Sequence, residues 1–204
     1  MTAPIKTQWQ LEDADALYGI SKWGAGYFGL NKQGNVCVTP DPTRDHMQID
    51  FAAVIEEIKQ ENIQFPVVVR FHDVLRNQVA QLNETFQRII AEANYQGLYR
   101  GVYPVKVNQM REVVEEIVEA GAPYHYGLEA GSKAELLTVM AYNTTPDALT
   151  ILNGYKDEEF MHLALLAQRL GRKVVIVIEK FSELHLIVKV AKEIGIDPII
   201  GVRA

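Results

Sequence analysis

The chain has 204 residues, of which 48% are hydrophobic and 23% charged, as in a globular protein that buries a core. Twenty-six acidic and 20 basic residues give a formal net charge of −6 without a basic cluster, which argues against nucleic acid as a partner and favours small molecules and other protein chains. No apolar run approaches the ~18 residues that cross a bilayer, so we expect no membrane contact. Residues 1–10 lack a secretory hydrophobic core, and the single cysteine, Cys37, excludes an internal disulfide. Both features predict a cytoplasmic location.

The first predicted element is a β-hairpin or small sheet over residues 17–38. Aromatic and β-branched side chains alternate there with glycines, and the sequence NKQGN at 31–35 suits a turn between two strands. A phosphate-binding loop does not fit these glycines, because no helical pattern follows them and the motif G-x-x-x-x-G-K-[ST] is absent. Cys37 is expected to be a small core residue, and the prolines within 39–45 predict a loop.

Two helices and a strand are predicted next. Asp50 is a suitable N-cap for a helix over 51–60, where apolar residues recur at helical spacing. The run FPVVVRF at 65–71 indicates a buried strand. A single apolar stripe then predicts a helix to about residue 94, with Asp73 as its cap.

Strands and helices alternate strictly from residue 97 onward. This order predicts right-handed βαβ crossovers and a parallel sheet. The predicted strands cover 98–106, 123–129, 148–153, 173–179 and 197–203. The predicted helices cover 109–120, 133–142, 157–170 and 183–194, and glycines at 121, 171 and 195 follow three of them as expected C-terminal caps.

One lysine lies at a position where burial of its charged side chain would be unfavourable. Lys106 is bracketed by β-branched and aromatic residues near the end of the strand predicted at 98–106. Lysine is seldom buried without a partner, and ligands bind at the carboxyl ends of parallel strands. Burial would lower the pKa of its amine from about 10.4 and leave a nucleophile for an aldehyde. The alternative is a lysine whose stem lies over the strand and whose charged end stays in water.

The other predicted strands also end in polar residues, which would converge at one rim in a barrel. The five positions are Lys106, Glu129, Asn153, Glu179 or Lys180, and Arg203. Any one of them is also explained by the polar character of loops. For Asn153, an Asn-Gly turn is an equally good explanation. The coincidence of all five favours a binding site.

The amino-acid sequences of several segments resemble those of a known family. The sequence YPVKVNQ at 103–109 is similar to the pyridoxal phosphate lysine motif of the alanine racemase-like, fold type III decarboxylases, and in detail it resembles the biosynthetic arginine decarboxylases. Further similar segments lie, in the same order as in that family, at 18–36, 65–79, 127–137, 152–157 and 174–184. The resemblance runs from about residue 9 to residue 204.

The resemblance implies a (β/α)₈ TIM barrel preceded by an N-terminal β-rich segment. We expect residues 1–64 to belong to the β domain, and 65–204 to contain a strand and helix followed by the first five barrel strands. An open, doubly wound five-stranded sheet is the structural alternative. Because a complete barrel needs eight such units and about 250 residues, the chain is expected to be the N-terminal portion of a larger protein.

The resemblance also implies the chemistry. Lys106 would form a Schiff base with pyridoxal 5′-phosphate in an enzyme that converts L-arginine to agmatine and CO₂ for polyamine synthesis. The resemblance makes Glu129 a cofactor-orienting acid and places Arg203 beside the cofactor. Asn153 is expected at the rim of the cofactor site. Magnesium and assembly as a homodimer or higher homo-oligomer are implied as well.

The family's remaining functional groups are expected beyond Ala204. These are the phosphate loop, the acid at the pyridine nitrogen, a histidine stacked on the ring and a cysteine from a second subunit, so the 204-residue segment alone is expected to be inactive. Ser132 and Glu135 have the S-x-x-E spacing of a capping box and predict a helix start instead of a phosphate site.

Three other functions stay open. The substrate of the same fold could be another basic amino acid such as ornithine, lysine or diaminopimelate, the protein could be a non-catalytic regulator, or Lys106 could react directly with a carbonyl substrate, as in aldolases.

Overall fold

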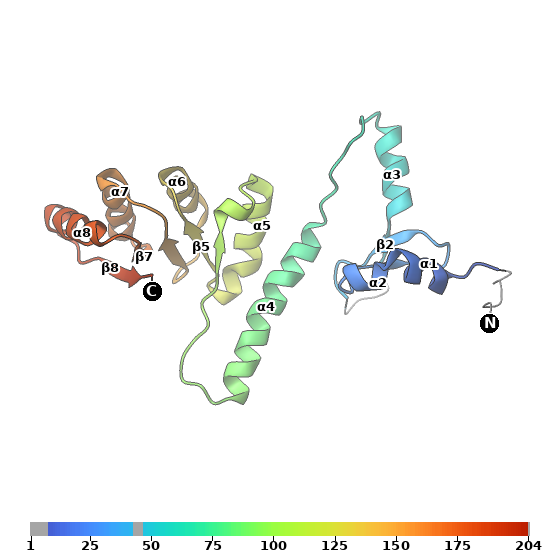
Figure 1. Ribbon diagram of the computed structural model, residues 1–204, viewed down its shortest axis with the longest axis horizontal. Coiled ribbons are helices and arrows are strands. Elements are labelled where there is room, and N and C mark those ends of the chain that lie inside the picture. Colours follow the sequence, from blue (N-terminus) through green and yellow to red (C-terminus); the bar gives the residue numbers. More distant parts are fainter. Residues whose placement is uncertain (1–7, 43–46, 204) are drawn as a thin grey trace, which may run out of the picture. The chain divides into compact units, whose positions relative to one another are not determined.

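The computed structural model describes residues 8–42 and 47–203 and divides into two compact units, residues 1–77 and 78–204. Figure 1 shows the elements of both units along the chain. Packing separates the chain after Asn77, whereas the sequence analysis divided it after residue 64, and that earlier boundary stays a prediction.

The first elements of the described part of this unit are helices and not strands. Helices α1 (Leu11–Tyr18) and α2 (Ile20–Trp23) occupy the start of the predicted β segment, which was therefore wrong for residues 17–23. Local hydrogen bonds explain the helices: the Asp15 carboxylate accepts from both the backbone N–H and the hydroxyl of Ser21, 2.7 Å away in each case. Side-chain bonds of this kind compete with strand pairing.

An antiparallel three-stranded sheet follows, as the hairpin prediction required. Its strands are β1 (Phe28–Leu30), β2 (Val36–Val38) and β3 (Ile49–Asp50), in the order β1-β2-β3. Cys37 on β2 is 1% exposed, which confirms it as a core residue. The part of the loop prediction that concerns residues 43–45 lies outside the described residues.

The predicted cap of the next helix is confirmed. Asp50 accepts a hydrogen bond from the Ala52 N–H at 2.9 Å at the start of α3 (Phe51–Gln60). The same carboxylate accepts from the side-chain amides of Asn35 and Asn31 in the hairpin turn, at 2.9 Å each. The bond from Asn35 is the main reason that the pKa of Asp50 is lowered.

The strand predicted over 65–71 is wrong. These residues carry no strand or helix up to Arg70, and Phe65 and Val68 are 53% and 75% exposed. An apolar run becomes a strand only where another strand pairs with it, and among the described residues neither sheet includes 65–71. Helix α4 (His72–Glu92) then begins one residue before Asp73, so Asp73 lies in the first turn, where its charge favours the helix dipole, and is not the cap.

The second unit is a five-stranded parallel sheet with helices on one face (Figure 1). Its strands are β4 (Val102–Pro104), β5 (Gly127–Ala130), β6 (Leu149–Leu152), β7 (Lys173–Ile178) and β8 (Ile199–Val202). Between them lie α5 (Arg111–Gly121), α6 (Lys133–Tyr142), α7 (Glu158–Arg169) and α8 (Phe181–Ile194), with short 3₁₀ turns η1 (Val105–Val107) and η2 (Ala122–Tyr124). The strands lie in sequence order without the reversal of a doubly wound sheet, which favours the barrel architecture.

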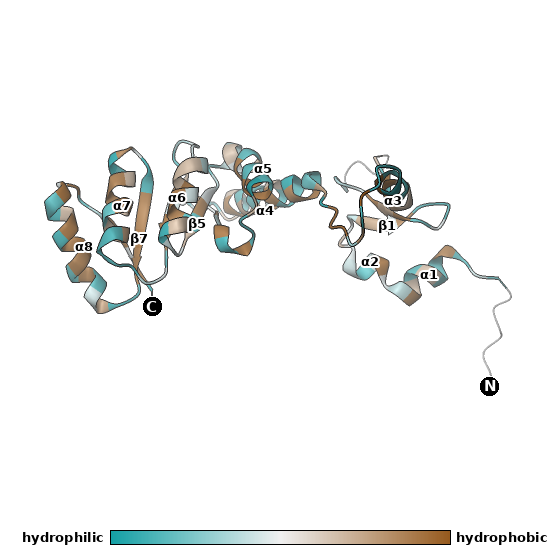
Figure 2. Cartoon of the chain, turned by 90° about the horizontal axis from the view of Figure 1, so that it is seen from above, coloured by the Kyte–Doolittle hydropathy of each residue, from teal (hydrophilic) through white to brown (hydrophobic). Residues whose placement is uncertain are grey.

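The core lies between the sheet and its helices. Alternate strand residues such as Leu128, Leu152 and Ile176 are fully buried, and they pack with helix residues such as Leu136 and Phe160. Figure 2 shows β7 as strongly hydrophobic and the helices with one hydrophobic and one hydrophilic side. Each fully buried side chain of this size contributes about 1.5–3 kcal/mol of hydrophobic stabilisation.

The three predicted glycine caps differ in outcome. Gly171 and Gly195 follow α7 and α8 with φ of +89° and +74°, as predicted. Gly121 was predicted to close its helix, but it is the last residue of α5 with an ordinary φ of −80°. A Cβ there would lie 2.6 Å from the Cβ of Tyr126, so a small residue is needed for packing.

Candidate cofactor site at the strand ends

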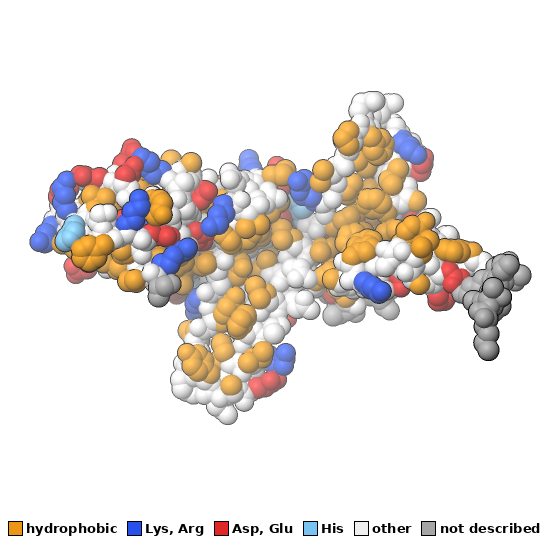
Figure 3. Space-filling view, viewed as in Figure 1, with side chains coloured by type: hydrophobic (Ala, Val, Ile, Leu, Met, Phe, Trp, Pro, Cys, Tyr) orange, Lys and Arg blue, Asp and Glu red, His pale blue; other side chains and the backbone are white. Residues whose placement is uncertain are grey.

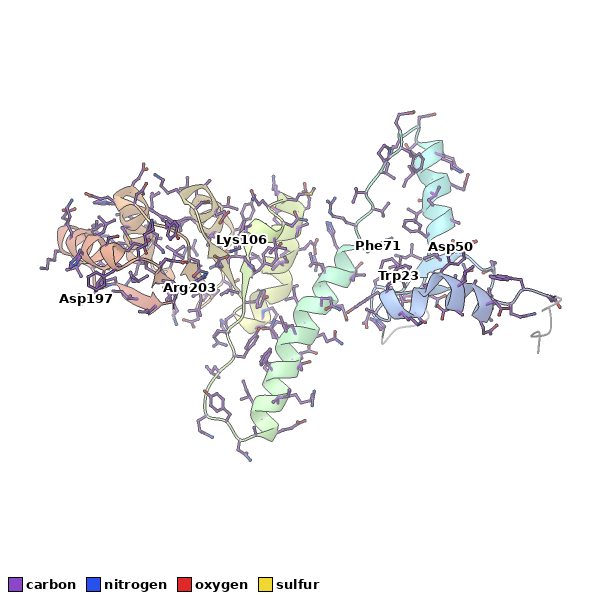
Figure 4. The ribbon with its side chains drawn as sticks, in the orientation of Figure 1. Trp23, Asp50, Phe71, Lys106, Asp197 and Arg203 are labelled. Carbon is purple, nitrogen blue, oxygen red and sulfur yellow. The ribbon has the colours of Figure 1, made fainter. Side chains whose placement is uncertain are left out.

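A pocket of about 330 Å³ lies at the carboxyl ends of the parallel strands. It is lined by Lys106, Gly131, Glu135, Asn153, Gly154, Tyr155, Glu179 and Arg203. Figure 4 labels Lys106 and Arg203. Lys106 follows β4 and Arg203 follows β8, the two edge strands of the five-stranded sheet. The predicted convergence of strand-end residues is therefore present in the fold.

Lys106 lies on η1, immediately after β4, and not within the strand. Its Nζ is 3.9 Å from Oε2 of Glu129, but 59% of its side chain is exposed. The expectation of a dry, buried amine is thus wrong for this structure. The strand ends at Pro104, so Lys106 lies in the 3₁₀ turn that follows and not in the buried part of the sheet.

Glu129 is a buried acid beside the pocket. It is 4% exposed, and its Oε1 accepts a hydrogen bond from the side-chain amide of Asn153 at 2.9 Å. Its Oε2 has no hydrogen-bond partner among the described residues, although Lys106 lies nearby. Since buried polar atoms are nearly always hydrogen-bonded, this oxygen is an exception within the described part of the chain.

Asn153 satisfies both of the explanations that the sequence left open. Its side chain reaches into the site to bind Glu129, and it is followed by Gly154 with a φ of +75°, as in an Asn-Gly turn. The structure also chooses between Glu179 and Lys180. Glu179 lines the pocket, whereas the Nζ of Lys180 lies 3.6 Å from the ring centroid of Tyr155.

Arg203 is held at the far side of the pocket by Glu179. The Nε of Arg203 lies 3.6 Å from Oε2 of Glu179, and the guanidinium side chain is 60% exposed. The other oxygen of Glu179 accepts a hydrogen bond from the Gly154 N–H at 2.8 Å. Lys106 and Arg203 thus face one pocket together with the carboxylates of Glu135 and Glu179. Glu129 lies buried beside this pocket, with its Oε2 3.9 Å from the Lys106 Nζ.

Glu135 is a pocket residue that the sequence analysis assigned only to a helix cap. Ser132 accepts from the Glu135 N–H at 3.3 Å and so caps α6, as predicted. The Glu135 carboxylate, however, accepts from the Gly131 N–H at 2.6 Å and lines the pocket. The signal available in the sequence was its position in the first turn of the helix that follows β5.

A buried ion pair next to the pocket was missed. Lys156 Nζ lies 3.5 Å from Oε2 of Glu183, and these side chains are 0% and 3% exposed. Both residues belong to segments that resembled the family, but no spacing rule joins a position on the loop after β6 to one in the first turn of α8.

The surface of this unit carries both signs of charge. Figure 3 shows acidic and basic side chains interspersed on the face in view. Within residues 8–42 and 47–203, no three His, Cys, Asp or Glu side chains are arranged to hold a metal ion. In the same described part of the chain, no helix has the length and apolarity needed to cross a membrane.

Comparisons with known proteins agree with the geometry. The family model "Pyridoxal-dependent decarboxylase, pyridoxal binding domain" matches residues 79–204. Biosynthetic arginine decarboxylases from Gloeobacter violaceus and Phocaeicola vulgatus are 50% and 44% identical to the chain over 196 residues, which are 96% of the chain and 30% and 31% of those proteins. The crystal structure of the biosynthetic arginine decarboxylase SpeA from Campylobacter jejuni matches 91% of the chain and 30% of its own length, with a TM-score of 0.81 and 34% identity. The chain therefore spans about 30% of the length of these relatives.

Proposed function

Since the chain belongs to the pyridoxal-dependent decarboxylases, we propose that it carries the lysine side of the cofactor site in an enzyme that converts L-arginine to agmatine and CO₂ for polyamine synthesis. The choice of arginine rests on relatives of 43–50% identity that are named biosynthetic arginine decarboxylases. A cytoplasmic location, magnesium and a homodimer or higher homo-oligomer belong to the same proposal and rest on the family resemblance.

The observation that carries the proposal is the buried Oε2 of Glu129, which has no hydrogen-bond partner among the described residues and lies 3.9 Å from the Lys106 amine. Together with the guanidinium of Arg203, these groups offer an amine for the aldehyde of pyridoxal phosphate and charged groups for its polar ring substituents. The pocket volume of about 330 Å³ falls within the range of small-molecule sites. The residues present therefore fit the cofactor.

Each of the four residues has a distinct part in this proposal. Lys106 Nζ is the atom that would hold the cofactor, and Glu129, whose Oε2 lies 3.9 Å from that amine, is the acid that would orient the cofactor. Asn153 fixes the Glu129 carboxylate through its amide hydrogen bond. Arg203, which keeps its charge at any physiological pH, supplies a fixed positive group at the opposite wall.

When bound, pyridoxal phosphate supplies a conjugated system that accepts the electron pair left by the departing carboxyl group. The protein has to orient the substrate's Cα–carboxyl bond and exclude water from it. With Lys106 59% exposed, the described residues do not by themselves exclude water from that bond.

The lysine assignment can be tested by trapping. The full-length protein is incubated with pyridoxal phosphate, reduced with borohydride and digested, and we expect the cofactor's mass on the peptide that contains Lys106. Lys106→Ala should lose the label, while Lys180→Ala, which removes an exposed lysine near the same pocket, should keep it. A label on another lysine, retained in Lys106→Ala, would contradict the assignment.

The substrate is tested separately with the full-length enzyme. We expect release of CO₂ and agmatine from arginine at a kcat/KM well above those for ornithine, lysine and diaminopimelate. Preference for one of the other amino acids would refute the arginine assignment and leave the cofactor site intact. Cofactor binding without any turnover would favour a non-catalytic regulator.

A further inference from the structure

The buried lysine beside the pocket is bonded to two separate segments. The Nζ of Lys156 donates to the carbonyl oxygens of Gly154 at 2.6 Å and Val177 at 2.5 Å, and its third bonding direction faces Glu183. An ammonium group has three donors, so all of them are used here. Lys156 thereby fastens the loop after β6 to strand β7.

Its partner joins the same two segments through their backbone N–H groups. Oε1 of Glu183 accepts from the Lys156 N–H at 2.9 Å, and Oε2 accepts from the Glu179 N–H at 3.0 Å. Burial alone would raise the pKa of the Glu183 carboxyl, but the bonds from Glu179 and Lys156 outweigh it and hold the pKa below 4.5. Glu183 is therefore anchored as a carboxylate on α8.

The two anchored segments carry the residues that hold Arg203. Glu179 follows the end of β7, and its carboxylate binds the Gly154 N–H at 2.8 Å and lies 3.6 Å from Arg203. Gly154 packs closely on the next loop, since a Cβ on it would lie 2.4 Å from the Gly131 carbonyl oxygen. A continuous set of contacts thus leads from the buried pair to three sides of the pocket.

Stability alone does not account for burying this pair. Removing two charges from water costs several kcal/mol per ion, and apolar residues of similar volume are often as stabilising as a buried ion pair. Burial indeed lowers the pKa of Lys156, against the opposing charges of Glu183 and Glu179. What an apolar pair cannot do is bond four backbone groups, two in the loop after β6 and two at the end of β7.

We propose that the Lys156–Glu183 pair positions the cofactor site: it fixes the loop at Gly154 and the end of β7 so that Glu179 holds Arg203 against the bound cofactor. This inference rests on the proposed pyridoxal phosphate site. Lys156 and Glu183 are positioning residues, because neither lines the pocket. Their effect is transmitted through Glu179 and Gly154 to Arg203.

The test compares Lys156→Met and Glu183→Gln with Lys133→Met in the full-length enzyme. Lys133 lies at the same end of the sheet and forms exposed ion pairs with Asp157 and Glu159, which makes it a matched lysine outside the site. For each folded variant, pyridoxal phosphate affinity is measured from cofactor absorbance, and kcat and KM are measured with arginine. Arg203→Ala is then added to the wild type and to each variant.

We expect the dissociation constant of pyridoxal phosphate to rise about 10- to 100-fold in Lys156→Met, because displacing a binding group by about 1 Å has effects of this size. Arg203→Ala should weaken binding strongly in the wild type and in Lys133→Met, but add little in Lys156→Met. Residues that act through one another show this non-additivity.

Two results would overturn the inference. One is a folded Lys156→Met protein that binds the cofactor within about twofold of the wild type, and the other is full additivity with Arg203→Ala, as a purely structural role predicts. If Lys156→Met does not fold, Glu183→Gln, which keeps the size of the side chain, is judged by the same criteria. A wild-type protein that binds no pyridoxal phosphate would instead refute the proposed function.

Discussion

Gly154 offers a quantitative test of how the loop after β6 shapes the site. Gly154 has a φ of +75°, and an added Cβ would lie 2.4 Å from the Gly131 carbonyl oxygen, closer than atoms of a real side chain approach backbone. Gly195 has nearly the same φ, +74°, and a Cβ there would meet nothing within 4 Å. The two glycines therefore separate backbone strain from steric overlap.

The expected magnitudes follow from these two terms. Gly195→Ala should lower the free energy of unfolding by about 1–2 kcal/mol, the strain of placing an L-residue in the left-handed region. Gly154→Ala carries the same strain and adds an overlap with backbone, for which overpacking is typically about 1–3 kcal/mol. We therefore expect a total loss of about 2–5 kcal/mol for Gly154→Ala.

The assay is denaturant unfolding of both variants, combined with a titration of pyridoxal phosphate. Gly154→Ala should also weaken cofactor binding, because its N–H holds Glu179 at the pocket, whereas Gly195→Ala should not. Equal losses of stability in the two variants, to within about 0.5 kcal/mol, would refute the argument that Gly154 is packed against Gly131.

Two further predictions concern the core and its charge. Leu128 is 0% exposed, so Leu128→Ala should lower the free energy of unfolding by about 2–5 kcal/mol. Leu137 is 57% exposed, so Leu137→Ala should stay within about 0.5 kcal/mol of the wild type. Equal effects of the two substitutions would contradict the assigned core. Glu183, whose pKa is lowered, contributes stability that is present above pH 4.5 and is lost as the pH falls through its lower folded-state pKa. Unfolding measured across this range should thus show a shallower acid loss in Glu183→Gln than in the wild type, and identical pH slopes would contradict the buried carboxylate.

The sequence by itself determined the alternation of strands and helices in the second unit. Hydrophobic periodicity is a local property, so all five parallel strands and the helices between them were predicted. The strands predicted over 98–106 and 123–129 were too long, because 105–107 and 122–124 form 3₁₀ turns. The same periodicity misjudged 65–71, because an apolar run does not show whether another strand will pair with it. Residues 17–23 failed for the related reason that side-chain bonds to the backbone outweighed their β propensity.

For the site, the sequence determined which residues reach the rim, namely Lys106, Glu129, Asn153 and Arg203. Parallel strands place their carboxyl ends at one edge, so residue position along each strand was sufficient. Only the tertiary structure decided the exposure of Lys106 and the pairing of Lys156 with Glu183. The exposure of Lys106 and the Lys156–Glu183 pair depend on how segments far apart in the chain pack together. Such contacts produce no periodic pattern in the sequence, so they could not be predicted from it.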